Sequence, residues 1–183
     1  LIPTPPLQTQ KRIADILSDY DDLIENNLKR IKLLEQAAQN IYKEWFVNLR
    51  FPGHENTPIN EETGLPVGWM KLTVEEYTKV ASRGPSLNYK IDEGFPVLNQ
   101  SCIRNGEIEL DKVRIAGKLK ENKEHCYLQI NDILINSMGQ GTLGRVSKNN
   151  SINEKFIIHN CITFLRSKDE YSQTLLYHFI SSK

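Results

Sequence analysis

The sequence predicts an α+β protein in which a long coiled-coil helix precedes a mixed α+β domain. Two observations carry this prediction. From Gln8 to about Asn48 the chain has no glycine or proline, and its apolar residues recur at alternating spacings of four and three. From Trp69 onward, short runs rich in β-branched residues lie between short helical segments without a regular strand–helix alternation. A chain of 183 residues has room for one such domain and an elongated appendage.

The composition is that of an ordinary globular protein and excludes several classes. Hydrophobic residues make up 39% and charged residues 25% of the chain, which is neither disordered nor fibrous. The 23 basic residues balance 23 acidic ones, so the bulk charge favours no partner. No apolar run approaches ~18 residues, so we expect no membrane-spanning helix and no membrane partner.

The N-terminus and the cysteines indicate the setting. Residues 1–6 lack an initiator methionine and the apolar stretch of a signal peptide, so we expect a piece of a longer protein. The three cysteines, Cys102, Cys126 and Cys161, are an odd number without CxxC spacing. This usage indicates free thiols in a reducing compartment, and we expect a cytoplasmic protein.

The long helix is expected to be an assembly element. Its seam fits a 3.5-residue repeat without interruption, which is typical of a coiled coil. The seam residues are Ile13, Leu17, Tyr20, Ile24, Asn27, Ile31, Leu34, Ala38, Ile41 and Trp45. A core helix of a bundle is the alternative, but the sequence predicts no second helix of similar length. We therefore expect a homodimer through an antiparallel helix pair. Asn27 either sets the register of that pair or is a tolerated polar residue.

A polar segment separates the helix from the second unit. Pro52 and Gly53 end the helix, and residues 51–68 are interpreted as a linker. A capping box over Thr73–Glu76 predicts a short helix to about Ala81. The predicted strands are 95–98, 107–110, 112–115, 127–130, 133–136 and 156–165, and a last helix opens over 175–180.

Several motifs, taken in their order, resemble the specificity subunits of type I restriction–modification systems. They are Ile2–Ala14, Leu23–Asn27, Glu44–Val47 with Arg50–His54, Gly64–Trp69, Gly94–Gln100, and Asp132–Ile135 with Gly141–Arg145. Each motif alone is weak, but together they extend the resemblance over essentially the whole chain.

The resemblance implies a fold and a function. In that family two recognition domains, each reading one half of a split DNA site, are joined by two long antiparallel helices. The subunit is non-catalytic and docks methyltransferase subunits and, through them, the endonuclease subunit. In this chain, residues 1–7 would be the tail of one recognition domain, 8–50 the spacer helix, 51–68 the linker, and 69–183 a second recognition domain, incomplete at its C-terminus. We therefore expect a truncated or half-length subunit whose partner is double-stranded DNA.

Polar loops of the second unit are the candidate DNA-binding elements. Residues 70–183 hold 16 basic and 13 acidic residues, a modest excess, but the basic ones are clustered. Lys79, Arg83 and Lys90 bracket a loop without acids, and residues 112–123 hold five basic residues against one acidic. Arg can bind phosphate or guanine, and Asn pairs with adenine. The DNA-binding candidates are Arg83, Ser86, Asn88, Asn99, Arg104, Gln140, Thr142 and Arg145. A solvated surface loop remains the alternative.

The segment Gly139–Gly144 spells GxGxxG after a predicted strand, which invites a dinucleotide-binding interpretation. That site needs a helix directly after the glycines, whereas residues 145–151 are of β and turn type. We expect instead a glycine-rich loop that approaches DNA, or a plain tight hairpin.

No catalytic or metal-ligating constellation is evident. His125-Cys126 and His159-Asn160-Cys161 lack the paired spacing of structural zinc sites, and His159 and Cys161 are expected to face the core with Ile157. We predict no cofactor, no metal and no enzyme activity in this chain. The alternative function is a coiled-coil interaction protein that assembles partner subunits without reading DNA.

Overall fold

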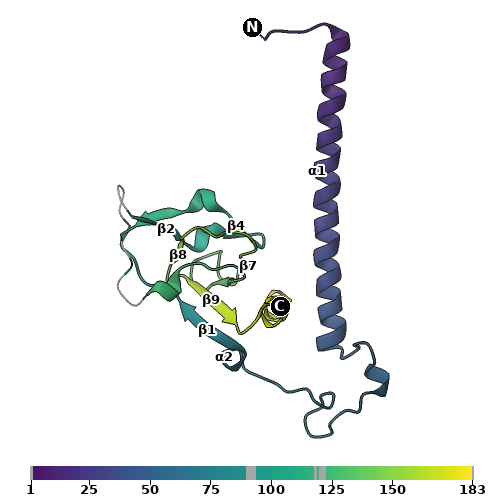
Figure 1. Cartoon of the computed structure of the whole chain (residues 1–183), viewed down its shortest axis with the longest axis vertical. Coiled ribbons are helices and arrows are strands. Elements are labelled where there is room, and N and C mark those ends of the chain that lie inside the picture. Colours follow the sequence, from purple (N-terminus) through teal and green to yellow (C-terminus); the bar gives the residue numbers. More distant parts are fainter. Residues whose placement is uncertain (1, 90–93, 118, 120–122, 183) are drawn as a thin grey trace. The chain divides into compact units, whose positions relative to one another are not determined.

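The computed structural model describes residues 2–89, 94–117, 119 and 123–182, and the chain divides into two compact units, Leu1–His54 and Glu55–Lys183 (Figure 1). Most of the predicted linker thus belongs to the second unit. Lys90 and part of the basic stretch 112–123 lie outside the described residues. Within the described ranges, no helix combines the length and the apolar character needed to cross a bilayer.

The first unit is built on one helix, α1, Leu7–Tyr42, which continues through a π-helical turn over Lys43–Val47. This confirms the long helix predicted from the seam. The helix ends at Asn48, where Leu49 adopts a positive φ of 57° and Pro52 follows shortly after. The uninterrupted helix follows from the absence of glycine and proline over this stretch.

The seam of α1 lies in solvent. Ile24 is 57% and Ile31 is 53% exposed, whereas a core helix would bury such side chains. Other large seam residues are also exposed, namely Ile13, Leu17, Tyr20, Leu34, Ile41 and Trp45. The buried residue of α1 is Tyr42, whose ring stacks on Phe46 at 5.3 Å between centroids. An apolar stripe of this length left uncovered favours a partner helix.

The second unit holds a four-stranded antiparallel sheet, a three-stranded sheet and a two-stranded hairpin, with the orders β1-β9-β6-β7, β5-β2-β8 and β3-β4. The strands are β1 Thr78–Arg83, β2 Phe95–Leu98, β3 Ile103–Arg104, β4 Glu107–Ile108, β5 Arg114–Ala116, β6 Ile133–Asn136, β7 Val146–Lys148, β8 Ile157–Ile158 and β9 Ile162–Ser167. Two helices, α2 Val74–Tyr77 and α3 Glu170–Ser181, flank this β structure. A long helix followed by such a domain confirms the α+β class.

The four-stranded sheet is covered on both faces. Successive residues of a strand point to opposite faces, so neighbours in β9 enter different cores. Phe164 packs in the main core with Leu98 of β2. Leu165, the next residue, packs on the other face against Leu176 of α3. The main core therefore joins the two larger sheets, and α3 closes the outer face.

The predicted helix over 73–81 is shorter than expected. Thr73 does cap α2, since its hydroxyl accepts from the Glu76 amide (3.2 Å) and the Glu76 carboxylate accepts from the Thr73 amide (2.8 Å). After Tyr77, however, the chain extends as β1. The alternating exposure along this strand and its pairing with β9 outweigh the local helical signal, so the predicted continuation to Ala81 is wrong.

Several strand predictions also differ from the structure. Residues 95–98 and 133–136 form β2 and β6 as predicted. The strand predicted over 107–110 is shorter, as β4, and the one predicted over 112–115 is shifted to β5. Residues 127–130 form no strand, because Tyr127 makes only an isolated bridge to Ile157. The strands β1, β3 and β7 are absent from the sequence prediction, and α3 begins earlier than predicted, at Glu170, capped by Asp169.

The predicted strand 156–165 is divided by a turn over 159–161 into β8 and β9, which lie in different sheets. The turn is held by the Asn160 amide, which donates to the Pro85 carbonyl (3.1 Å). Consequently Ile157 and Cys161 do not share a face: Ile157 packs in a small cluster with Val97, and Cys161 packs in the main core. The prediction that these residues face the same side is wrong, because the alternation of side chains along a strand is interrupted by the turn.

Candidate nucleic-acid interface

One end of the four-stranded sheet gathers several polar loops. Because all neighbouring strands in this sheet are antiparallel, β1 and β6 end where β9 and β7 begin. Arg83 at the end of β1 lies opposite Thr163 of β9, which on its other side lies opposite Ile135 of β6. The connections that follow β1 and β6 and the turn that precedes β9 therefore emerge at the same end.

A fourth segment joins them, since the Asn136 side-chain amide donates to the Gln100 carbonyl (2.9 Å). We call this part of the domain the loop end. It comprises residues 84–89, 99–106, 137–145 and 159–161. None of these four segments contains an acidic residue, and together they carry many hydroxyl and amide side chains. With Arg83, Arg104 and Arg145 they form a basic, hydrogen-bonding surface of the kind that binds nucleic acid.

Hydrogen bonds join the end of β1 and the loop 84–89 to the turn 159–161. Arg83 donates from Nε and Nη2 to the Asn160 carbonyl (2.8 and 2.7 Å). The Gly84 amide is 3.4 Å from the Ile162 carbonyl. A Cβ at Gly84 would lie 1.7 Å from the Ile158 carbonyl oxygen, so only glycine fits there. The first loop is therefore seated on the turn rather than free in solvent.

The glycine-rich segment forms the tight hairpin between β6 and β7. The amides of Thr142 and Leu143 donate to the Gly139 carbonyl (3.2 and 3.1 Å), and the chain continues directly into β7. Gly139 has φ of 112°, a conformation that favours glycine. The segment is therefore a tight hairpin, and β7 rather than a helix that could hold a pyrophosphate follows the glycines.

The eight DNA-binding candidates are not equally placed. Ser86, Asn88, Arg104 and Gln140 are exposed at the loop end, and Thr142 is half-buried within the hairpin. The Arg104 guanidinium lies 4.0 Å from the Glu109 carboxylate. Arg145 donates to the Gly141 carbonyl (3.0 Å) and to the Ile103 carbonyl (3.4 Å), so it latches the hairpin as well as contributing charge.

Asn99 differs from the other candidates because it is only 3% exposed. Its side-chain oxygen accepts from the Ser101 amide (2.8 Å), and its side-chain nitrogen donates to the Lys112 carbonyl (3.0 Å). The side chain caps a 3-10 turn over Gln100–Cys102 and has no surface for a base. We assign it a structural role and withdraw it from the DNA-binding set.

A stack of three side chains borders the loop end. The guanidinium carbon of Arg114 lies 5.2 Å from the centroid of the Tyr89 ring. That ring stacks in turn on His159, at 5.3 Å between centroids and 26° between planes. Burial and then the nearby Arg114 lower the pKa of His159 below its ordinary value. Sequence reasoning counted Arg114 only within the basic stretch 112–123, because nothing local predicts that Tyr89 lies beneath it.

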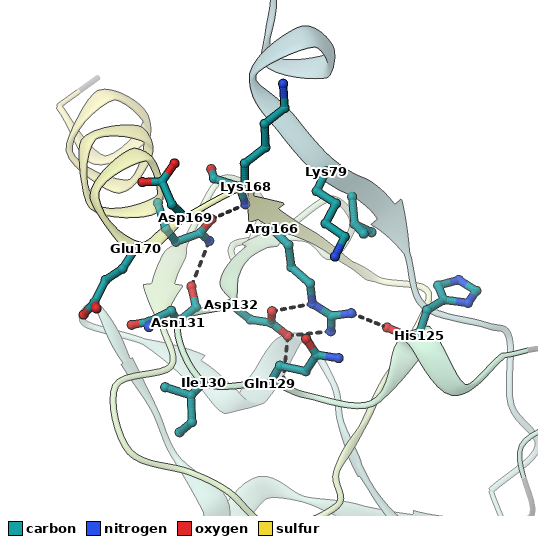
Figure 2. Close-up of a pocket in the computed structure, with 13 residues that line it drawn as sticks. Lys79, His125, Gln129, Ile130, Asn131, Asp132, Arg166, Lys168, Asp169 and Glu170 are labelled. Carbon is teal, nitrogen blue, oxygen red and sulfur yellow. Dashed lines mark hydrogen bonds and ion pairs between the residues drawn. The ribbon is translucent and has the colours of Figure 1, made fainter.

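The opposite end of the sheet holds a cavity of about 350 Å³ built around an ion pair (Figure 2). Arg166 Nε donates to Asp132 Oδ1 at 2.6 Å and Nη2 to Oδ2 at 2.8 Å, and the two side chains are 12% and 1% exposed. The remaining Arg166 bonds reach the carbonyls of His125 and Tyr127, both at 2.7 Å. Four of the five guanidinium N–H donors are thus used within the protein, which indicates a structural pair rather than a ligand site.

The histidines and cysteines show no metal-site geometry. Among the described residues, no group of three or more potential ligands is close enough to hold a metal ion. All three cysteines are free and buried. Burial raises the pKa of the Cys102, Cys126 and Cys161 thiols, so they are protonated and behave as small apolar side chains.

The chain is similar in sequence to a family model and to several known proteins. Residues 1–36 match the family model described as the type I restriction modification DNA specificity domain. The putative type I restriction enzyme MjaX specificity subunit of Methanocaldococcus jannaschii is 30% identical over 93% of this chain and 43% of its own length. The MjaVIII specificity subunit of the same organism is 25% identical over 100% of this chain and 44% of its own length. The chain thus spans less than half the length of these relatives.

A solved structure shares the fold. The HsdS subunit from Thermoanaerobacter tengcongensis superposes with a TM-score of 0.50 at 18% identity, over 99% of this chain and 42% of that one. At this identity the likeness concerns the fold alone: a long helix and a strand-rich domain in the same order along the chain.

Proposed function

The chain belongs to the family of type I restriction–modification specificity subunits, and from this premise we propose that it is a non-catalytic DNA-recognition module that reads one half of a split site. The observation that carries the proposal is the loop end, where Arg83, Arg104 and Arg145 meet three acid-free polar loops and an acid-free turn. Methylation and cleavage would be performed by partner subunits that dock on the chain.

In the proposed mechanism some residues of the loop end bind DNA phosphates and others bind base edges. Arg104 is exposed and, unlike Arg83 and Arg145, donates to no backbone carbonyl in the described part of the chain, so it is suited to a phosphate. Asn88 and Gln140 carry exposed side-chain amides, which can pair with the N6 and N7 positions of adenine in the major groove. The hydroxyls of Ser86 and Thr142 add groups to this surface that can accept or donate hydrogen bonds.

Replacing Arg104 by Ala tests the proposed surface. We expect weaker binding to all duplex sequences and a salt-dependence slope lowered by about one unit, because one phosphate contact is lost. The measurement is fluorescence anisotropy of a labelled mixed-sequence duplex, with the chain assembled with its methyltransferase partner. Lys168→Ala removes one charge at the opposite end of the sheet and should leave affinity and slope unchanged. Equal effects of the two variants would argue against the loop end.

Replacing Gln140 by Ala separates base reading from phosphate binding in the same assay. The salt slope should stay at its original value, while the preference for one base position relaxes by ~1–3 kcal/mol. Selection from a randomised duplex library measures that preference. An unchanged preference in both the Gln140 and the Asn88→Ala variants would leave these loops without a role in reading bases.

The exposed seam of α1 supports the proposal that two copies of the chain pair through antiparallel helices. Such a dimer has two-fold symmetry and presents two identical loop ends, which suits a palindromic split site.

The double variant Ile24→Lys plus Ile31→Lys should abolish the dimer, because pairing would bury four ammonium groups, two from each chain, in the seam. Light scattering measures the mass in solution. The control is Asn26→Lys plus Leu33→Lys, which adds the same charge at the same seven-residue spacing but on the outer side of the heptad. A wild-type chain that is monomeric at micromolar concentration, or equal dissociation of both variants, would refute the pairing.

A further inference from the structure

We propose that Arg114 is a further DNA-contacting residue, binding a backbone phosphate, and that Tyr89 stacked on His159 is the positioning element that holds it beside the loop end. The proposal rests on the DNA-recognition function proposed above. It adds a residue from the three-stranded sheet to a surface otherwise formed at the end of the four-stranded sheet.

Among the described residues, the guanidinium of Arg114 has no bonding partner, unlike those of the other arginines nearby. Arg83 and Arg145 donate to backbone carbonyls, and Arg104 has Glu109 beside it. Arg114 is exposed, and within the described part of the chain its guanidinium has no carboxylate or carbonyl partner. The nearby carboxylate of Asp111 is instead bonded to Lys112 Nζ at 2.6 Å. Arg114 therefore keeps its in-plane N–H donors for a ligand.

The geometry of the stack explains how Arg114 is held without losing those donors. A guanidinium that lies over an aromatic face is attracted by the ring, while its N–H groups point outward in the plane. The Tyr89 ring also stacks on His159, and the Tyr89 backbone bridges to Ala116 of the same strand as Arg114.

The His159 end of the stack is fixed to the domain. Its Nδ1 lies 3.3 Å from Cys161 Sγ, and its amide donates to the Leu98 carbonyl (3.0 Å). Since the pKa of His159 is lowered, the imidazole is neutral at pH 7 and does not repel the cation above Tyr89. The stack thus presents a positive charge that has no acidic partner among the described residues, next to the turn 159–161.

A phosphate suits this arrangement better than a base edge. A planar guanidinium with free paired donors binds phosphate oxygens bidentately. The Tyr89 ring contacts both Arg114 and His159, which limits the room for a base to stack on it. The predicted contact is therefore independent of sequence, unlike the contacts proposed for Gln140 and Asn88.

The test uses the full chain assembled with its methyltransferase partner and a labelled mixed-sequence duplex at several potassium chloride concentrations. Arg114→Ala is expected to weaken binding to all sequences roughly tenfold and to lower the salt slope by about one unit. Tyr89→Leu keeps the charge, so it should weaken binding with the slope unchanged. Tyr89→Phe keeps the ring and should behave as wild type.

A double-mutant cycle identifies the positioning role, because a merely structural effect of Tyr89 would persist without Arg114. We expect Tyr89→Leu to cost nothing further in the Arg114→Ala background. If Arg104→Ala weakens binding and Arg114→Ala does not, this proposal fails while the proposed function stands. If neither variant changes binding, the DNA-recognition function itself fails. A loss confined to one sequence, with an unchanged salt slope, would overturn the phosphate assignment.

Discussion

Asp132→Asn is expected to destabilise the second unit by ~3–5 kcal/mol, because it leaves the Arg166 guanidinium buried without its counter-charge. The carboxylate accepts from two guanidinium nitrogens and from the Gln129 amide (2.9 Å). An asparagine side chain has only one acceptor oxygen, so its NH₂ group would face an N–H donor of Arg166 or Gln129. The loss is a large share of the ~5–15 kcal/mol that stabilises an ordinary domain.

The measurement is urea unfolding followed by near-ultraviolet circular dichroism, which reports on the packing of the aromatic rings. Asp111→Asn is the matched control, since it makes the same chemical change in an exposed ion pair whose side chains are 48% and 63% exposed. Exposed pairs contribute at most ~1 kcal/mol, so the control should unfold close to the wild type. Similar midpoints for the two variants would show that the buried pair does not hold the domain together.

Lengthening α1 by one heptad should move methylation to a site whose unread spacer is longer by about three base pairs. Duplicating Ile24–Arg30, near the middle of the seam, preserves the heptad register in both paired helices. Seven residues at ~1.5 Å each add about 10.5 Å between the two recognition domains of the proposed dimer. One base pair rises ~3.4 Å, and bending of DNA could change the result by one pair in either direction.

The spacer is measured by sequencing the sites that the variant methylates when it is assembled with its methyltransferase partner. Both half-site sequences should remain the same, since the loop end is unchanged. A seven-residue glycine–serine insertion after Asn150, in an exposed turn of the second unit, is the control and should leave the spacer as it was. A heptad variant that acts only on the original spacer would show that the helix does not set the distance.

The long helix could be predicted in detail because its information is local and periodic. Each seam residue from Ile13 to Trp45 repeats the same signal, so no single position decides the assignment. The capping box at Thr73 was equally readable, since both of its hydrogen bonds join residues three positions apart. The absence of a helical pattern after the glycine segment argued against a dinucleotide-binding site, but it left a DNA-approaching loop and a plain hairpin as alternatives.

The candidate site could be predicted only as a set of residue types. Local sequence shows that the loops around Asn88 and Gln140 are polar and free of acids. It does not show that they meet, because that depends on β1, β9, β6 and β7 being paired antiparallel in that order. It also does not distinguish Asn88, which is exposed, from Asn99, which is buried as a cap.

By itself the sequence determined the spacer-like helix, its exposed apolar seam, the α+β class and the family resemblance, all of which depend on short-range periodicity or on motif order. The tertiary structure alone decided where strand 156–165 breaks, which arginines donate to backbone carbonyls, and that Arg114 lies over the Tyr89 ring. These features arise from hydrogen bonds and ring contacts between distant positions, such as Arg83 with Asn160 and Arg114 with Tyr89. A local sequence pattern does not predict which residue from a distant segment will contact it in the folded chain.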